Sequence, residues 1–249
     1  MSEQLKPRLE VCPSPAMLPL YDVSSSVVVI IDVLRATSTI CTALYNGAEQ
    51  VIPVASVAEC IRTGQALKAI TAGERDGFIA EGLQYGNSPF EYPREFVAGK
   101  TVVLTTTNGT RLLHMASGAA IIITGSFPNL SEVCSYLVGQ SLGVILGCAA
   151  WKDRVNLEDM LFAGAVVNRV RGHFHVDCDA ALIAETLYLQ ARHDLFGAMK
   201  KATHYHRLAG YGMEKDIRYC LTADIAPSLP LLENGALVNR STVVAATGR

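Results

Sequence analysis

The feature that most constrains the fold is a short apolar run that passes almost directly into a helical pattern. Val27–Ile31 consists only of valine and isoleucine, which is typical of a strand buried on both faces of a parallel sheet. The helical spacing of Ala36–Tyr45 begins five residues later and ends at Asn46-Gly47, a favourable helix C-terminus. This strand and helix predict one repeating unit of an α/β protein.

The same alternation continues through the first two thirds of the chain. Further strands are expected at 50–54, 101–105, 119–123 and 143–146, with a short apolar segment before Gly73. Further helices are expected at 57–69, 110–116, 128–138 and 157–170. The last third, Asp179–Tyr219, reads mainly as helix and is followed by Pro227–Leu232 and Ala236–Val238. The alternation predicts a mostly parallel sheet with helices on both faces, and the lack of a linker predicts one domain, 1–249.

Composition excludes several classes of function. Half of the 249 residues are hydrophobic and 18% are charged, which supports a buried core and excludes a disordered chain. The formal net charge of −2 provides no positive field for nucleic acid. No apolar run approaches the roughly 20 residues of a membrane helix, and residues 1–10 carry no signal-peptide pattern. We therefore expect a cytoplasmic protein that binds neither nucleic acid nor membrane, and assembly into a homo-oligomer stays open.

The residues that follow each strand are the first candidates for a functional site, because ligands of open parallel sheets bind outside the carboxyl ends of the strands. Asp32–Thr39 follows the first strand and enters a helix, whose N-terminal N–H groups suit phosphate. Arg35 offers a bidentate donor, and Asp32 offers oxygen to a hard cation such as Mg²⁺. The segment also brings three hydroxyl groups, those of Thr37, Ser38 and Thr39. The alternative is that Asp32 and Thr37 only cap the helix while Arg35 pairs on the surface.

Two later segments add donors. Glu74 follows a short apolar segment and Gly73, and the next loop contains Asn87 and Ser88, which can donate to anionic oxygens. A solvated turn would have the same composition. The segment Thr105–Thr110 again ends a strand and opens a helix, and its Asn-Gly precedes a helical pattern rather than a second strand. That order favours an anion-binding loop over a hairpin turn.

A fourth segment, 147–154, leads into a helix that begins with two acids. Asn156 is a natural N-cap, and Glu158 and Asp159 complement the positive end of the helix dipole without any further function. Their place at the same edge of the sheet keeps a metal-binding role open. Pairs of histidines at 173 and 175 and at 204 and 206 raise zinc as an alternative, but clustered hard oxygen ligands favour Mg²⁺.

Taken together, these segments resemble the 2-phosphosulfolactate phosphatase family. The matching pieces, in the family's order and spacing over roughly residues 27–165, are Asp32–Thr39, Gly73-Glu74, Gly86–Pro89, Thr106–Thr110, Leu157–Asp159 and Ala163-Gly164. A weaker match continues through Asp216–Cys220 and Asp224. One departure lies at His204, where the family's His-Gly-Arg is replaced by His-Tyr-His.

The resemblance implies a three-layer α/β/α sandwich with a mixed sheet and a Mg²⁺-dependent phosphatase. Its substrate would be 2-phospho-3-sulfolactate, and in methanogens the step belongs to coenzyme M biosynthesis. The alternatives are a metal-dependent phosphatase of another small phosphorylated hydroxy acid and a non-catalytic module that binds an anionic metabolite. A substrate with a phosphate, a carboxylate and a sulfonate carries about four negative charges, so its burial needs a cation and several donors.

These considerations assign expected roles to particular residues. The expected catalytic residues are Asp32 and Arg35. The expected Mg²⁺ ligands are Asp32, Glu74, Glu158 and Asp159. The expected substrate-binding residues are Thr37, Ser38, Thr39, Asn87, Ser88, Thr107, Asn108, Gly109, Thr110, Lys152 and Arg154. Whether Asp32 attacks phosphorus or only holds metal and water is left open by the sequence.

Overall fold

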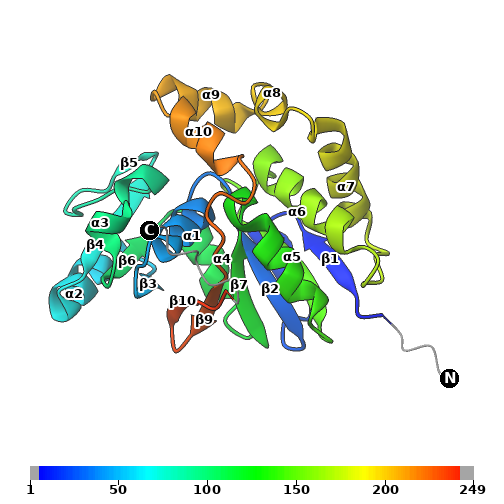
Figure 1. Cartoon of the computed structure of the whole chain (residues 1–249), viewed down its shortest axis with the longest axis horizontal. Coiled ribbons are helices and arrows are strands. Elements are labelled where there is room, and N and C mark those ends of the chain that lie inside the picture. The colour runs from blue at the N-terminus through cyan, green and yellow to red at the C-terminus, as the bar shows by residue number, and fades with distance from the viewer. Residues whose placement is uncertain (1–5, 242–249) are drawn as a thin grey trace, which may run out of the picture.

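The computed structural model describes residues 6–241, which form a ten-stranded mixed sheet covered by helices (Figure 1). The strands are β1 (Leu9–Cys12), β2 (Ser26–Ile31), β3 (Gln50–Pro53), β4 (Ile70–Arg75), β5 (Phe78–Ile79), β6 (Thr101–Thr105), β7 (Ile121–Gly125), β8 (Gly143–Cys148), β9 (Pro230–Glu233) and β10 (Ala236–Asn239). They are arranged in the order β1-β8-β2-β7-β9-β10-β3-β6-β4-β5. The expected mostly parallel, mixed sheet is confirmed.

The α-helices fall between the strands, as the sequence predicts, and also form a separate run after β8. Their bounds are α1 (Ala36–Tyr45), α2 (Val57–Leu67), α3 (Arg94–Val97), α4 (Gly109–Met115), α5 (Leu130–Val138), α6 (Leu157–Val170), α7 (Asp179–Ala191), α8 (Leu195–Met199), α9 (Thr203–Gly210) and α10 (Glu214–Cys220). Short 3₁₀ turns are η1 (Pro15–Leu20), η2 (Pro89–Glu91) and η3 (Phe127–Asn129). No helix within residues 6–241 is long and apolar enough to cross a membrane.

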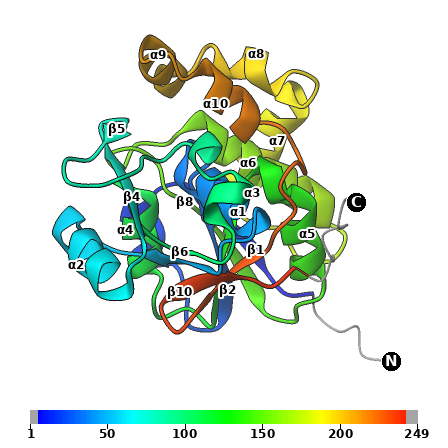
Figure 2. The same cartoon turned by 60° about the vertical axis from the view of Figure 1, so that its left-hand side comes forward.

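Strand β2 shows why the sheet has a layer of helices on each face. Val27, Val29 and Ile31 belong to one apolar core, which helices α5, α6 and α7 help to build. Val28 and Ile30 point the other way into a second core, which α1 and α4 help to build. Because successive side chains of a strand point to opposite faces, an uninterrupted apolar run is what two cores require. The three-layer α/β/α arrangement is therefore confirmed (Figure 2).

The sheet consists of two parallel groups joined by an antiparallel hairpin. Strands β1, β8, β2 and β7 are parallel to one another, as are β3, β6 and β4. The hairpin β9–β10 lies between the groups and pairs antiparallel with β7 at Ile123–Leu231 and with β3 at Leu237–Val51. Three successive antiparallel pairings mean that the two groups run in opposite directions.

The terminal strands are where the sequence reading falls short. β1 lies in a stretch that was not predicted as a strand, and the two apolar pieces near the C-terminus turn out to form the hairpin at the centre of the sheet. The helix expected at 57–69 ends at Leu67, because Lys68 adopts a left-handed conformation (φ 51°). The expected strand at 119–123 is shifted to Ile121–Gly125.

Helices α8, α9 and α10 gather at one end of the molecule, beyond α1 and α6, in both views (Figures 1 and 2). Side chains of α9, among them His204 and Arg207, line a pocket together with residues that follow the strands. The helical C-terminal third thus covers the strand ends where the sequence predicts a site.

Candidate active site

A polar pocket lies where the carboxyl ends of four strands meet helix α9. Asp32 follows β2, Glu74 belongs to the end of β4, Thr107 follows β6 and Lys152 follows β8. Arg207 is contributed by α9. The four strands come from both parallel groups of the sheet, so residues far apart in sequence line one cavity, as predicted from the strand ends.

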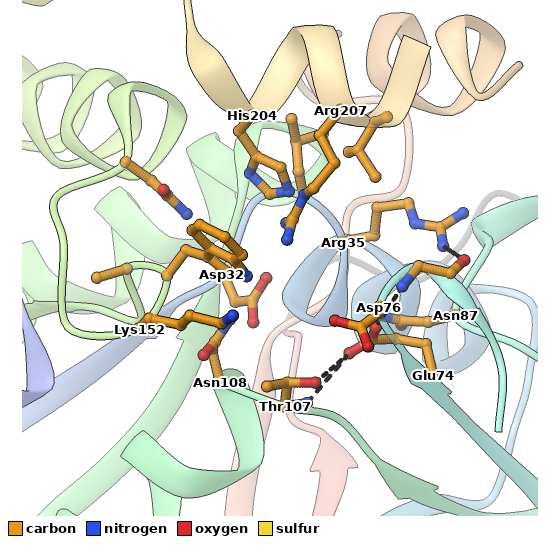
Figure 3. Close-up of a pocket in the computed structure, with 16 residues that line it drawn as sticks. Asp32, Arg35, Glu74, Asp76, Asn87, Thr107, Asn108, Lys152, His204 and Arg207 are labelled. Atoms are coloured by element: carbon orange, nitrogen blue, oxygen red, sulfur yellow. Dashed lines mark hydrogen bonds between the residues drawn. The ribbon is translucent and has the colours of Figure 1, made fainter. Parts of the chain in front are cut away.

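The charged groups of the pocket are distributed unevenly. Figure 3 shows Glu74 and Asp76 on one wall and Lys152 on the opposite wall, with Asp32 between them. Arg207 reaches into the same space from α9. Arg35 lies on the same side as Glu74 and Asp76, so a ligand in this pocket would meet both acidic and basic groups.

Asp32 is a buried carboxylate with one oxygen in use and one free. Its Oδ1 accepts a hydrogen bond from the Ala36 N–H (3.3 Å), so the capping role considered from the sequence is real. No donor within residues 6–241 bonds to Oδ2, which lies against Gly109, where a Cβ would stand 2.8 Å from it. Burial, together with the nearby charges of Glu74 and Glu158, raises the pKa of Asp32 to about 6.

Arg35 is buried rather than on the surface. Its Nη1 donates to the carboxylate of Asp216 on α10, and its Nη2 donates to the Gly77 carbonyl (3.3 Å). Only 6% of the residue is exposed, yet it lines the pocket. The alternative of a surface ion pair is thus wrong, because the partner is a buried acid from the segment with the weaker family match.

Two of the expected metal ligands have both carboxylate oxygens engaged by neighbouring donors. Glu74 accepts from the Thr107 N–H (3.1 Å) and hydroxyl (3.0 Å) through Oε1 and from the Gly77 N–H (2.9 Å) through Oε2. Asp159 accepts from the N–H groups of Val33 (3.0 Å) and Ala150 (3.1 Å). Both acids therefore tie together loops that follow different strands.

The pKa of Asp159 lies well above its usual range, first because the group is buried and then because Glu158 and Asp32 are close. Asp159 is 1% exposed and does not line the pocket. Its carboxylate supports the loops after β2 and β8 from beneath the site.

Glu158 is fully buried and contacts His204. The contact joins Glu158 Oε1 to His204 Nδ1, whereas Glu158 Oε2 is buried without a hydrogen-bond partner within residues 6–241. His204 lines the pocket from α9. A carboxylate that holds one ring nitrogen fixes the orientation of the imidazole and leaves the other nitrogen for chemistry.

In the part of the chain that the structure describes, no group of three or more His, Cys, Asp or Glu side chains is arranged to hold a metal. The four expected ligands, Asp32, Glu74, Glu158 and Asp159, are therefore not brought together as one preformed site. Hydrogen bonds to neighbouring groups account for this in Glu74 and Asp159, and His204 accounts for it in Glu158. Within residues 6–241, Asp32 Oδ2 and the buried Oδ1 of Asn87 belong to pocket-lining residues and have no hydrogen-bond donor, and Glu158 Oε2 lies unpartnered behind the pocket.

The expected substrate-binding residues divide into two sets. Four of them line the pocket, namely Asn87, Thr107, Asn108 and Lys152. Gly109 instead provides the close approach of α4 to Asp32. Arg154 does not line the pocket, and its backbone closes a turn with Trp151.

The hydroxyl groups after β2 hold the fold together rather than lining the pocket. Thr37 donates to the Gly125 carbonyl (2.9 Å), Ser38 to Val33 (2.8 Å) and Thr39 to Asn87 (2.9 Å). The hydroxyls of Ser88 and Thr110 are likewise used in local turns, at the start of η2 and α4. Short side chains at a helix start satisfy nearby backbone groups, which explains why the pattern resembled a binding loop.

Some lining residues were not proposed as site residues from the sequence. They are Leu34, Asp76, Gly77, Ala150, Trp151, Asn156, His204, Arg207 and Leu208. His204 and Arg207 lie on a helix far along the chain, so no strand end marks them. Trp151 had a detectable signal, because the sole tryptophan of the chain lies three residues after the end of β8.

A three-layer sandwich with a buried carboxylate facing basic side chains at the strand ends defines an α/β enzyme for a small anionic molecule. The family model described as 2-phosphosulpholactate phosphatase matches residues 12–235. The chain therefore belongs to the 2-phosphosulfolactate phosphatase family, a group of phosphoric monoester hydrolases.

Individual relatives support the same assignment, and each is named a probable 2-phosphosulfolactate phosphatase. One from Thermotoga petrophila is 41% identical over 89% of this chain and 96% of its own. One from Caldanaerobacter subterraneus subsp. tengcongensis is 39% identical over 86% of this chain and 90% of its own length. One from Synechocystis is 39% identical over 81% of this chain and 87% of its own length.

Proposed function

We propose that the protein is a Mg²⁺-dependent phosphatase that hydrolyses 2-phospho-3-sulfolactate to 3-sulfolactate and phosphate. The family and the names of the relatives support the substrate. The observation that carries the proposal is Asp32, whose free oxygen faces a pocket that also presents Arg35, Lys152 and Arg207. A cytoplasmic location and a place in coenzyme M biosynthesis stay predictions.

The oxygen donors of the pocket suit a magnesium ion that keeps most of its waters. Mg²⁺ is commonly bound through one or two carboxylates together with substrate phosphate and water. Asp32 would hold the ion through Oδ2, and Asn87 Oδ1 offers a second, neutral oxygen. The carboxylate also fits, because burial and the repulsion from Glu74 and Glu158 raise its pKa, and a cation would offset both. When bound, Mg²⁺ supplies charge stabilisation to the phosphoryl oxygens.

Arg35 would bind the phosphoryl group. Asp216 and the Gly77 carbonyl each take one of its N–H groups and fix the side chain in place, which leaves further donors of the guanidinium for a ligand. A donor held in position before the reaction stabilises developing charge at little reorganisation cost.

His204 would hold a proton at Nε2 near the ester oxygen that leaves phosphorus. Glu158 holds the other ring nitrogen, so the ring is oriented toward the pocket. An imidazole placed in this way can protonate a leaving alkoxide, which is a poor leaving group without a proton. The exposed His206 on the same helix does not line the pocket and provides a matched control for substitution.

The test is a phosphate-release assay over a panel of phosphorylated hydroxy acids, with Mg²⁺ and with EDTA. The proposal predicts release from 2-phospho-3-sulfolactate, loss of release in EDTA and recovery on adding Mg²⁺. Preference for another acid would replace the substrate but keep the reaction. Tight binding with no release would indicate a non-catalytic binding module.

A further inference from the structure

One wall of the pocket carries two basic side chains on the same aromatic ring. The Arg207 guanidinium carbon lies 4.3 Å from the centroid of the Trp151 ring, and Lys152 Nζ lies 4.6 Å from it. Tryptophan is the most favourable aromatic partner for a cation, so the ring helps to hold both groups in place. Figure 3 shows Lys152 and Arg207 directed into the pocket.

These two cations lack the neutralising acid that Arg35 has. Arg35 is paired with the buried Asp216, whereas neither Lys152 nor Arg207 forms an ion pair or a side-chain hydrogen bond within residues 6–241. Two positive charges held against one ring without an ion-pair partner make this part of the pocket electropositive. An anionic ligand beside the ring would be attracted by both charges.

The backbone around Trp151 and Lys152 contains several non-glycine residues in the left-handed region. Trp151 and Arg154 exchange two backbone hydrogen bonds, of 2.9 and 3.0 Å, across a two-residue turn. Both turn residues, Lys152 (φ 51°) and Asp153 (φ 60°), are left-handed although neither is glycine, and Ala150 before them is also left-handed (φ 56°). Such turns favour Asn-Gly, and backbone conformations of this kind concentrate at ligand-binding sites.

The space beside the ring extends beyond the main pocket. An adjoining cavity is lined by Trp151, Asn156, Thr203, His204 and Arg207. All of these except Thr203 also line the main pocket. A ligand with its phosphate near Asp32 therefore has room for a second group beside the tryptophan.

We propose that Trp151, Lys152 and Arg207 form a subsite for a second acidic group of the substrate, a sulfonate or carboxylate that does not react. This rests on the proposed function and adds a basis for specificity: the enzyme selects organic phosphates that carry a further acidic group. The planar guanidinium of Arg207 suits a flat carboxylate or a sulfonate face, and Lys152 adds a point charge.

The experiment measures the binding of the two product fragments separately by calorimetry, with 3-sulfolactate and with inorganic phosphate. Arg207→Gln and Lys152→Gln should each weaken 3-sulfolactate binding by about 10- to 100-fold, the range for a lost charged hydrogen bond. Phosphate binding should change less than about twofold, because Asp32 and Arg35 remain. Loss of phosphate binding to the same degree, or no loss for either ligand, would overturn the subsite.

The chain contains a matched control, a second lysine and arginine on one ring. Lys200 and Arg218 lie 5.4 and 3.5 Å from the Phe196 centroid, and none of the three lines the pocket. Lys200→Gln and Arg218→Gln should leave both affinities unchanged. A wild-type protein that does not bind 3-sulfolactate contradicts the subsite. A wild-type protein that binds 3-sulfolactate but releases no phosphate from 2-phospho-3-sulfolactate contradicts the proposed function and leaves the subsite standing.

Discussion

At the scale of the residue, Asp32 lowers the stability of the metal-free protein at neutral pH and is the proposed metal ligand of the pocket. It is a buried carboxylate whose pKa is raised to about 6 by desolvation and by Glu74 and Glu158. Its folded pKa exceeds the ordinary value of 3.8, so the folded state binds the proton more tightly than the unfolded state. The corresponding contribution to stability is present below about pH 4 and is lost as pH rises through about 6.

Asp32→Asn should therefore stabilise the metal-free protein at neutral pH. In EDTA, urea unfolding at pH 7.5 should show a gain of up to about 3 kcal/mol, the equivalent of a shift of about two pKa units. At pH 4 the gain should vanish, because the wild-type carboxyl is then protonated as well. Asp159→Asn provides the contrast: removing its buried charge also favours the folded state, but one of the N–H groups of Val33 and Ala150 loses its acceptor, so the net gain should be smaller than for Asp32→Asn. A stability of Asp32→Asn equal to wild type at both pH values would refute this account of the site.

Arg35 and Asp216 are predicted to affect both stability and activity. Arg35→Ala leaves a buried acid without its partner, and the expected loss is about 3–5 kcal/mol of unfolding free energy together with about 10²-fold or more in kcat/KM. Asp216→Asn keeps the guanidinium but loosens it, so kcat/KM should fall by roughly tenfold. Steady-state kinetics and thermal melting of both variants test this. An Arg35→Ala enzyme with near-wild-type kcat/KM would show that the phosphate is held elsewhere.

The sequence predicted which residues follow the strands better than which of them line the pocket. Asp32, Arg35 and Lys152 were found because they follow strands. Thr37, Ser38 and Thr39 follow the same strand but turn to carbonyl groups of the fold, a choice that depends on which strand lies alongside. Local sequence contains no information about that neighbour, so hydroxyl groups that bond to the protein and those that bind a ligand look alike.

At the scale of the element, the hairpin β9–β10 joins the two parallel groups and depends on its turn. The turn residues are Asn234 (φ 49°) and Gly235 (φ 82°), the Asn-Gly pair that favours a two-residue hairpin. The pair lies between two apolar pieces that the sequence reading treated separately. The signal for the hairpin was therefore present, but its place at the centre of the sheet depends on single pairings with β7 and β3.

Gly235→Ala should lower the stability of the protein through the backbone alone. A Cβ there meets no atom within 4 Å, so the expected cost of about 1 kcal/mol comes from the left-handed conformation. This corresponds to a melting temperature lower by roughly 2–4 °C. Gly118→Ala is the control, since Gly118 has open space around it and no left-handed φ. Equal melting temperatures for the two variants would mean that the turn tolerates a side chain.

At the scale of the whole molecule, the active-site pocket forms although the two parallel groups run in opposite directions. In a flat sheet their carboxyl ends would lie at opposite edges. Asp32 and Lys152 from one group nevertheless line the same pocket as Glu74 and Thr107 from the other. The sequence predicted that strand ends would meet, but the hairpin that lies between the two groups comes from the last strands of the chain.

Magnesium binding at Asp32 predicts a change in the stability of the whole chain. A ligand that binds only the folded state stabilises it by about 2.7 kcal/mol at 100 times its dissociation constant. Saturating Mg²⁺ should raise the melting temperature of the wild type by several degrees and that of Asp32→Asn by much less. A similar rise for both proteins would place the ion elsewhere.

The most direct test of the active-site assignment is kcat/KM for 2-phospho-3-sulfolactate in saturating Mg²⁺, compared between wild type and Asp32→Asn. The two side chains have nearly the same shape, and the variant is expected to be at least as stable in the absence of metal, so a loss of activity would not reflect unfolding. We predict a decrease on the order of 10³-fold or more, as for the loss of a central electrostatic group. A folded Asp32→Asn enzyme within about tenfold of wild type would contradict the assignment of this pocket as the active site.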